Sequence, residues 1–429
     1  MAACWRLAHE REEPRMVLKG QGGKQVYSDG EETEQRMLAV AQAYPEDLSQ
    51  NYIAKDSTYT VNNTFSAARQ NILNWYPFKK DAQILEVGAG MGAITGMLCD
   101  RAAHVTALEM NRSRAGVIRA RYPKRDNLEV VSGDIKEWQT CRTYDYVVFI
   151  GVLEYAAIFS DAEKPYVEFL KNAGRFLKED GTLLFAIENR FGLKYWLGAS
   201  EDHLQEPFAG LMGYKDKKGP RTFSRAELAS RLEQSGFLHY RFYSVLPDYK
   251  FPELIFADSF QPDAMNLKKV SFTYAKNSTL AGDEKRLYQD LIVNGVFPFF
   301  ANSFLVEASA RELADRYALH VSAKGEVYPQ FRVSTAVFND GYAYKIPMHR
   351  DAKAHLQAIV DNMEYLEKRG IAVLPYEYGQ DGHVARCKLY SGTSAQQVFK
   401  AALAENDKVR LKELVECLRD CYLKSSEAA

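Results

Sequence analysis

Short apolar runs alternate with amphipathic stretches between about residues 60 and 260. The runs that predict strands are QILEVG (83–88), HVTALE (104–109), LEVVSGD (128–134), YDYVVFIG (144–151) and GTLLFAIEN (181–189). The helical patterns that separate most of them cover residues 92–101, 112–121 and 162–178. Apolar strands separated by helices indicate a parallel sheet that is covered on both faces. We therefore expect an α/β domain in this part of the chain.

Further elements flank this alternation. Residues 60–75 have a helical pattern that Pro77 closes, and Ser224 with Glu227 three positions later predicts a capped helix after residue 224. Two apolar runs, residues 237–247 and 251–260, are joined by only a few residues, so they should pair as an antiparallel hairpin.

The chain divides into three parts by composition. Residues 1–45 are charged and contain several glycines, which is typical of a poorly ordered arm or a peripheral helix. Residues 46–265 contain the strand and helix alternation. Residues 266–429 mix predicted antiparallel strands with amphipathic helices, so we expect a second, smaller α+β domain there.

Composition narrows the functional class. Lys plus Arg total 55 and Asp plus Glu total 56, so the net charge of −1 gives no case for a nucleic acid partner. No apolar run reaches the ~20 residues that span a bilayer, and the N-terminus lacks the apolar core of a secretory signal. The six cysteines are scattered and complete no zinc-binding pattern, so we expect no metal and a reducing, cytoplasmic location.

A glycine cluster follows the first strand of the α/β domain, in the pattern E-x-G-x-G-x-G from Glu86 to Gly92. Glycines allow a tight turn and a close approach of the backbone to a ligand, and the following helix N-terminus favours an anionic group. Gly88, Gly90 and Ala93 also satisfy the dinucleotide pattern G-x-G-x-x-G/A. The glycines alone leave NAD, a sulfonium nucleoside or a ligand-free turn open.

Three carboxylates decide between these ligands. Glu86, two residues before the first glycine, suits a cofactor with an ammonium group and would repel a pyrophosphate. Glu109 ends the second strand, where it can accept hydrogen bonds from ribose hydroxyls, which also fits NAD. Asp134 ends the third strand, where an acid can accept from an adenine amino group.

The segments ILEVGAGMG, VTALEMN, VVSGDI and YDYVVFIGVLEY, in that order and spacing, resemble the class I S-adenosylmethionine-dependent methyltransferases over about residues 60–260. The resemblance implies a Rossmann-like, seven-stranded sheet whose final strand is inserted antiparallel, with S-adenosylmethionine as cofactor. It implies cofactor contacts from the glycine loop and from the ends of the next strands, namely Glu86, Gly88, Ala89, Gly90, Gly92, Glu109, Met110, Asp134, Ile135 and Gly151. Glu154 and Tyr155 would lie near the transferred methyl group.

The segment of residues 189–222 leaves the carboxyl end of a strand, where ligands of open α/β sheets gather, so we expect it to cover the methyl acceptor. His203 is its candidate base, because histidine titrates near neutrality. The alternative is a histidine that caps or packs the loop. Glu154 is alternatively a buried carboxylate that accepts from backbone N–H groups, and Tyr195 and Trp196 are alternatively packing residues.

The sequence segment ENRFGLKYWLGASEDH also resembles a narrower bacterial group of proteins that is associated with surface polysaccharide, glycosyltransferases and kinase-like partners. This resemblance favours a saccharide hydroxyl or another small polar acceptor for an O-methyltransferase. The alternative function is a binding or scaffold protein whose methyltransferase-like domain serves a partner such as a glycosyltransferase or a kinase. We expect any protein partner to contact residues 266–429.

Residues 341–366 resemble the third strand and following helix of a protein-kinase-like amino lobe. Lys345 would contact phosphate, with Glu364 or Asp361 as its partner on the helix. The departures are the lack of a glycine-rich loop before Lys345, the position of HRD directly after the strand, and the lack of a D-F-G motif. The alternatives are an incomplete kinase-like lobe and an unrelated α+β fold, and we expect no phosphotransfer by this chain alone.

Overall fold

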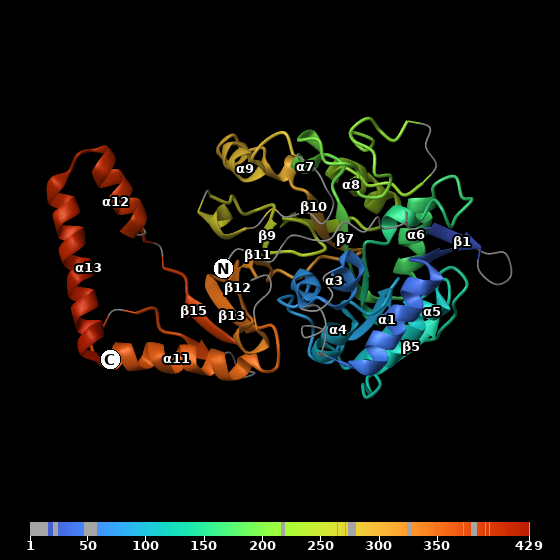
Figure 1. Ribbon diagram of the computed structural model, residues 1–429, viewed down its shortest axis with the longest axis horizontal. Helices are drawn as coiled ribbons and strands as arrows, with labels where there is room; N and C mark the ends of the chain where they lie inside the picture. The colour runs from blue at the N-terminus through green and yellow to red at the C-terminus, as the bar shows by residue number, and fades with distance from the viewer. Residues whose placement is uncertain are drawn as a thin grey trace. The chain divides into compact units, whose positions relative to one another are not determined.

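The computed structural model describes residues 16–19, 25–46, 58–215, 219–263, 265–270, 272, 280–323, 328–371, 373–378, 384–390, 392–393 and 395–428. It consists of two compact units, Met1–Glu326 and Val327–Ala429, whose elements are labelled in Figure 1. The domain boundary that we expected after residue 265 thus lies at residue 326. Among the described residues, no helix has both the length and the apolar character needed to cross a bilayer. The five cysteines in this part of the chain are free thiols.

Five parallel strands form one half of the sheet in the first unit, in the order β5-β4-β3-β6-β7. Their bounds are Gln83–Val87 (β3), His104–Glu109 (β4), Leu128–Ser132 (β5), Tyr144–Ile150 (β6) and Leu177–Glu188 (β7). The predicted parallel α/β sheet is confirmed. All five strands direct their carboxyl ends to one edge, where Glu109 and Glu188 are the last strand residues.

The inserted antiparallel strand is β10 (Ser303–Ser309), which lies between β7 and β8 (His239–Leu246) and is antiparallel to both. The predicted hairpin of β8 with β9 (Leu254–Ala257) is present. With β11 (Ala318–Ser322) beyond β9, the sheet of this unit has nine strands rather than seven. We had assigned residues 299–309 to the second domain. They belong to this sheet because all seven residues of β10 are buried, as a central strand requires.

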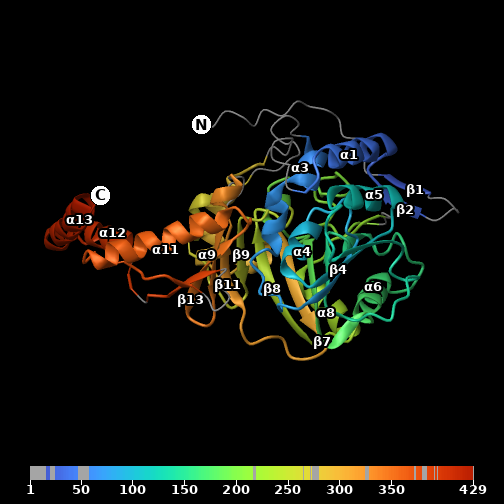
Figure 2. The same cartoon turned by 90° about the horizontal axis from the view of Figure 1, so that it is seen from below.

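Helices cover both faces of the sheet. Leu108 of β4 packs in one core with Leu170 of α6 (Pro165–Gly174) and Leu228 of α8 (Arg225–Gln234). Its neighbour Ala107 points the other way and packs against Ile118 of α5 (Arg112–Arg121). Figure 2 shows the strands between α4 (Thr95–Arg101) and α5 on one side and α6 and α8 on the other. The alternation along a strand thus produces the two covered faces that the apolar runs predicted.

Two helix starts follow from local side-chain chemistry. The Asn111 side chain accepts from the backbone N–H groups of Ser113 and Arg114 at the start of α5. Ser224 and Glu227 form the predicted capping box of α8. The predicted helix over residues 60–75 is instead α3 (Tyr59–Phe65) followed by a 3₁₀ helix, η1 (Ala67–Ile72). The break lies at Ser66, which has extended backbone and whose hydroxyl caps η1 by accepting from the Ala68 N–H.

Much of the expected N-terminal arm is folded onto the sheet domain. Strands β1 (Met16–Lys19) and β2 (Gln25–Ser28) pair antiparallel, and α1 (Glu31–Ala43) follows. Met37 and Val40 of α1 pack with Val117 of α5 and with Met91. This segment therefore contributes to the core beside the glycine loop.

The segments that follow β7 and that precede β10 lie beyond the carboxyl ends of the parallel strands. A short helix, α7 (Leu193–Trp196), lies in the segment of residues 189–222, and α9 (Glu284–Val293) and α10 (Phe297–Phe300) precede β10. Phe191 stacks on Phe299, and the Asn189 side chain donates to the carbonyls of Phe299 and Ala301. These contacts fix the insert to the segment that leads into β10.

The second unit contains β12 (Val333–Phe338), β13 (Tyr342–Pro347), β14 (Glu377–Tyr378) and β15 (Ala385–Lys388). They pair antiparallel in the order β14-β15-β13-β12, with α11 (Ala352–Lys368), α12 (Ala395–Ala404) and α13 (Lys408–Ala428). Lys345 donates to Thr335, whereas Glu364 pairs with Lys368 and Asp361 accepts from Gln357. The expected kinase-like pair of Lys345 with Glu364 or Asp361 is therefore not formed.

Candidate functional site

The glycine loop between β3 and α4 is shaped by left-handed backbone at Gly88, Gly90 and Gly92, with φ of +65°, +61° and +80°. Residues with a side chain rarely adopt this backbone conformation, so glycine is favoured at all three positions. A Cβ on Gly88 would lie 2.7 Å from a methyl group of Val152, whereas a Cβ on Gly90 would meet only the Arg114 guanidinium at 3.2 Å. At Gly88 a side chain would clash with Val152, whereas at Gly90 a side chain would project into open space.

That open space is a pocket along the carboxyl edge of the parallel strands. Nine of the ten residues expected at the cofactor line it, namely Glu86, Gly88, Ala89, Gly90, Glu109, Met110, Asp134, Ile135 and Gly151. Gly92 does not. Its carbonyl oxygen accepts hydrogen bonds from Arg121 Nη1 at 2.8 Å and from the Tyr122 hydroxyl at 2.8 Å. Gly92 therefore stabilises the turn of the loop without lining the pocket.

Glu86 is buried at the end of β3 and accepts a hydrogen bond of 2.6 Å from the Thr95 hydroxyl. Burial raises the pKa of Glu86 to about 8, although the Thr95 bond opposes the shift. A buried carboxylate of this kind is stabilised by a cationic ligand, because a nearby positive charge offsets the loss of hydration. This environment fits the ammonium group of S-adenosylmethionine.

Glu109 and Asp134 end neighbouring strands and are held by local backbone. The Glu109 carboxylate accepts from the N–H groups of Gly90 and Asn111 at 2.8 and 2.9 Å, and burial raises its pKa while Arg114 opposes the rise. Asp134 accepts from the Lys136 N–H at 2.9 Å beside buried Ile135. Two carboxylates at adjacent strand ends, with the Gly90 cradle between β3 and α4, fit a ribose and an adenine, so the pocket is suited to the cofactor.

Sequence reasoning missed several residues of this pocket, among them Tyr27 and Arg114. Tyr27 of β2 lines it, and Arg114 of α5 lies over the Tyr27 ring at 4.7 Å and 3.6 Å from Asp29. Asn111 also donates to the Tyr27 carbonyl, which ties β2 to the turn after β4. No local pattern marks these residues, because they meet only when residues 25–43 dock on α5.

The pocket continues past the glycine loop to Tyr155 and His203, two of the three expected catalytic residues. The Tyr155 hydroxyl lies 3.1 Å from His203 Nδ1, and the two rings pack edge to face. Tyr27 packs against the other side of Tyr155, and Tyr249 and Lys250 complete this end of the pocket. The insert of residues 189–222 therefore reaches the pocket through His203.

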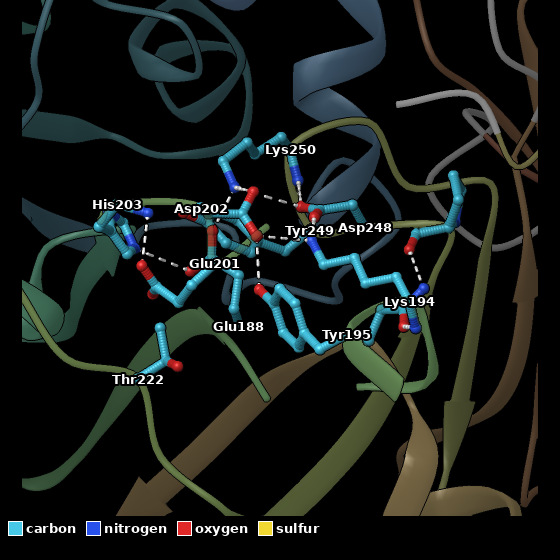
Figure 3. Close-up of polar contacts among 12 residues, drawn as sticks. Glu188, Lys194, Tyr195, Glu201, Asp202, His203, Thr222, Asp248, Tyr249 and Lys250 are labelled. Carbon is cyan, nitrogen blue, oxygen red and sulfur yellow. Dashed lines mark hydrogen bonds and ion pairs between the residues drawn. The ribbon is translucent and has the colours of Figure 1, made fainter. Parts of the chain in front are cut away.

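Behind His203 lies a dense group of charged side chains, shown in Figure 3. His203 Nε2 is 3.5 Å from Glu188 Oε2, and the other Glu188 oxygen is bonded by Lys250. Although burial opposes it, Lys250 and His203 hold the pKa of Glu188 below its usual range. Burial alone would lower the pKa of His203, but Glu188 and then Glu201 raise it to about 8.

The remaining charges of this group surround the Lys194 ammonium. It lies 2.8 Å from carboxylate oxygens of both Asp202 and Asp248, and Asp202 also accepts from the Tyr195 hydroxyl. Glu201 accepts from the backbone N–H groups of His203 and Leu204, which fixes the loop that carries the imidazole. Tyr195 is thus a buried structural residue, and half-exposed Trp196 donates to the Phe191 carbonyl, in agreement with packing roles.

Glu154, the third expected catalytic residue, is completely buried and does not line the pocket. Burial and then Glu188 raise the pKa of Glu154 to about 8, and the Tyr249 hydroxyl lies 3.4 Å from one of its oxygens. This burial fits the alternative of a buried carboxylate, and a role for Glu154 near the transferred methyl group stays a prediction. Glu188, which faces His203, ends its strand as Glu109 does, and the sequence placed it at the start of the segment expected to cover the acceptor.

Comparisons with known proteins support a class of enzyme. The family model that describes ribosomal RNA adenine dimethylases matches residues 46–166. A tRNA1(Val) (adenine(37)-N6)-methyltransferase of Bacteroides thetaiotaomicron is 28% identical over 146 residues, which are 30% of this chain and 62% of that protein. A ubiquinone biosynthesis O-methyltransferase of Rickettsia bellii is 26% identical over 160 residues, 36% of this chain and 63% of that protein. The chain thus spans less than two thirds of each.

Among solved structures, a possible histamine N-methyltransferase from Thermotoga maritima matches 64% of this chain and all of its own chain, with 15% identity and a TM-score of 0.35. The sequence matches and the glycine-loop pocket support a class I S-adenosylmethionine-dependent methyltransferase, and S-adenosylmethionine is its cofactor. The names of the relatives refer to RNA adenines and to ubiquinone biosynthesis. They give no support to our expectation of a saccharide acceptor or to the exclusion of nucleic acid.

Proposed function

We propose that this protein transfers a methyl group from S-adenosylmethionine to an oxygen atom of a small polar acceptor, with a saccharide hydroxyl as the favoured class. The observation that carries the proposal is the continuity of one pocket from the glycine loop and Glu109 to Tyr155 and His203. A methyl donor bound at the glycine loop and an acceptor bound at Tyr155 would lie in adjoining parts of one pocket, as direct transfer between two bound reactants requires.

The acceptor contact is Tyr155 rather than His203. Only 4% of the His203 side chain is exposed, and its two ring nitrogens face Tyr155 and Glu188. Tyr155 therefore stands between His203 and the acceptor, and His203 acts as a positioning residue. The Tyr155 oxygen accepts a hydrogen bond from the acceptor hydroxyl and aligns its lone pair with the methyl group.

When bound, S-adenosylmethionine supplies an electrophilic methyl group and leaves as a neutral thioether. The chain's own residues then align the acceptor oxygen, and the Tyr155 oxygen holds the hydroxyl hydrogen, which is lost to water as the new C–O bond forms. The aromatic rings of Tyr27, Tyr155 and Tyr249 flank this end of the pocket, beside the Lys250 ammonium. Apolar ring faces beside hydroxyl and charged groups suit a polar acceptor that itself contains a ring.

The test is a mass-shift screen of the full-length protein with S-adenosylmethionine against monosaccharides, oligosaccharides, phenols, amines and short RNAs. We expect methylation of a hydroxyl acceptor and its loss in Tyr155→Phe. Methylation of RNA adenine or of an amine would replace the proposed acceptor. Cofactor binding without methylation of any acceptor class would contradict the proposal and favour the scaffold function.

A further inference from the structure

Three buried polar atoms face one another behind the pocket wall. Glu154 Oε2, Glu188 Oε2 and His203 Nε2 each lack a hydrogen-bond partner among the residues that the structure describes. One ligand atom from each of the three residues lies within 4.8 Å of the others, and Nε2 of His203 is 3.5 Å from Oε2 of Glu188. Glu154 and Glu188 are completely buried, and the His203 side chain is 4% exposed. Buried polar atoms are normally hydrogen-bonded, whereas here two of the three form only the 3.5 Å ion pair, so the group is suited to a ligand between them.

We propose that Glu154, Glu188 and His203 bind one divalent cation. Two carboxylate oxygens and one imidazole nitrogen form a mixed ligand set that suits Mn²⁺, Fe²⁺ or Zn²⁺. The three residues come from the 3₁₀ helix after β6, the end of β7 and the insert of residues 189–222. Small side-chain rotations would bring the three atoms to the ~2.0–2.2 Å at which such ions are bound.

The atoms of these side chains that face away from the site are already held. The second Glu188 oxygen is bonded by Lys250, His203 Nδ1 lies 3.1 Å from the Tyr155 hydroxyl, and Glu154 Oε1 lies 3.4 Å from the Tyr249 hydroxyl. Metal ligands in proteins are typically oriented in this way by a partner on their other polar atom. The arrangement therefore directs one free atom of each residue toward a common point.

The charge balance of the group also favours a cation. Five carboxyl groups, those of Glu154, Glu188, Glu201, Asp202 and Asp248, gather around the two ammonium groups of Lys194 and Lys250 and the imidazole of His203. Buried carboxylates without matching cations are costly, and a divalent ion at the three free atoms would offset two of these charges. A second grouping, of Glu188, Asp202 and Asp248, is less suited, because Lys194 and Lys250 already pair with its oxygens.

The cation has a consequence for catalysis that rests on the proposed function. A metal ion on His203 Nε2 would leave Nδ1 to carry the ring hydrogen, so His203 would donate to the Tyr155 oxygen. That oxygen would then be oriented as the acceptor for the substrate hydroxyl. Sequence reasoning expected no metal, because residues 154, 188 and 203 have no characteristic ligand spacing.

The experiment is a titration of chelator-treated, full-length protein with Mn²⁺ and separately with Zn²⁺, followed by calorimetry and by the melting temperature, with no acceptor or cofactor present. We expect one ion per chain and a higher melting temperature. Glu154→Gln, Glu188→Gln and His203→Gln, which come from three segments, should each weaken binding more than tenfold. Glu307→Gln is the matched control and should leave affinity unchanged, because Glu307 is a buried carboxylate of β10 that is bonded by Arg241 and Tyr243.

No ion bound by the wild type, or equal affinity in all three variants, would overturn the inference. Because binding is measured without methyl transfer, its outcome is independent of the proposed function. Tight binding by a protein that methylates no acceptor would leave the cation site standing and remove only the proposed function. Full methylation of a hydroxyl acceptor by chelator-treated protein that binds no Mn²⁺ or Zn²⁺ would leave the proposed function standing and remove the cation site.

Discussion

The Tyr155 hydroxyl lies 3.1 Å from Nδ1 of His203, although 48 positions separate the two residues in the chain. Tyr155 follows β6, whereas His203 belongs to the insert after β7. The bond joins the pocket wall to the segment that covers it. Both residues line the end of the pocket, but only 4% of the His203 side chain is exposed, so acceptor chemistry should be tested first on Tyr155.

Tyr155→Phe should lower methyl-transfer turnover by about 10²–10⁴, the usual effect of losing a group that accepts or orients a proton. Cofactor affinity should stay within about twofold, because the ring remains packed against Tyr27. The measurement is the initial rate with the acceptor found by the mass-shift screen, beside calorimetry with S-adenosylhomocysteine. Tyr166→Phe is the control, since the buried Tyr166 hydroxyl has no hydrogen-bond partner among the described residues. Full turnover in Tyr155→Phe would remove Tyr155 from catalysis.

Gly90→Ala should weaken S-adenosylmethionine binding by more than tenfold while the protein stays folded. The added methyl group would point into the cofactor space, and the left-handed backbone would add strain of about 1–2 kcal/mol. Gly236→Ala is matched for strain, because Gly236 has φ of +90° and nothing within 4 Å of its Cβ, and it lies outside the pocket. Calorimetry on both variants checks the prediction, and similar affinity losses in the two would show that strain alone is responsible.

The affinity for S-adenosylmethionine should rise with pH toward about 8. Free Glu86 has a pKa of about 8, so below that pH an ammonium ligand that needs the carboxylate must displace a proton. The cost grows as pH falls, up to about tenfold in affinity per pH unit. Calorimetry between pH 6 and 8 measures the slope, and Glu86→Gln should bind weakly and without that slope. An unchanged slope in Glu86→Gln would assign the dependence to another group.

Arg121→Met should destabilise the first unit by on the order of 3 kcal/mol. The buried Arg121 guanidinium donates to the carbonyls of Thr64 and Gly92 at 2.7 and 2.8 Å, so its loss leaves buried acceptors unpaired beside the glycine loop. Arg119→Met, on the exposed side of the same helix, should cost under about 1 kcal/mol. Chemical denaturation of both variants tests this, and equal stability would mean that the loop does not depend on Arg121.

The parallel strands, the glycine loop and the capping box of α8 could all be predicted from the sequence. Each depends on residues that are close in the chain, such as the apolar run of β3 or the pair Ser224 and Glu227. Hydrophobic periodicity and capping act over a few residues, so a linear pattern records them. The family resemblance of these short segments implied ten cofactor contacts, and nine of those residues line the pocket.

The sequence by itself thus determined a parallel α/β domain with a cofactor loop at its carboxyl edge. Only the tertiary structure decided that β10 completes the sheet, that Tyr27 closes the pocket, and that Glu154, Glu188 and His203 converge. Those relationships join segments tens to more than a hundred positions apart, and they arise from burial and charge compensation in three dimensions. No spacing along the chain encodes them, because β10 takes its place only through pairing with β7 and β8.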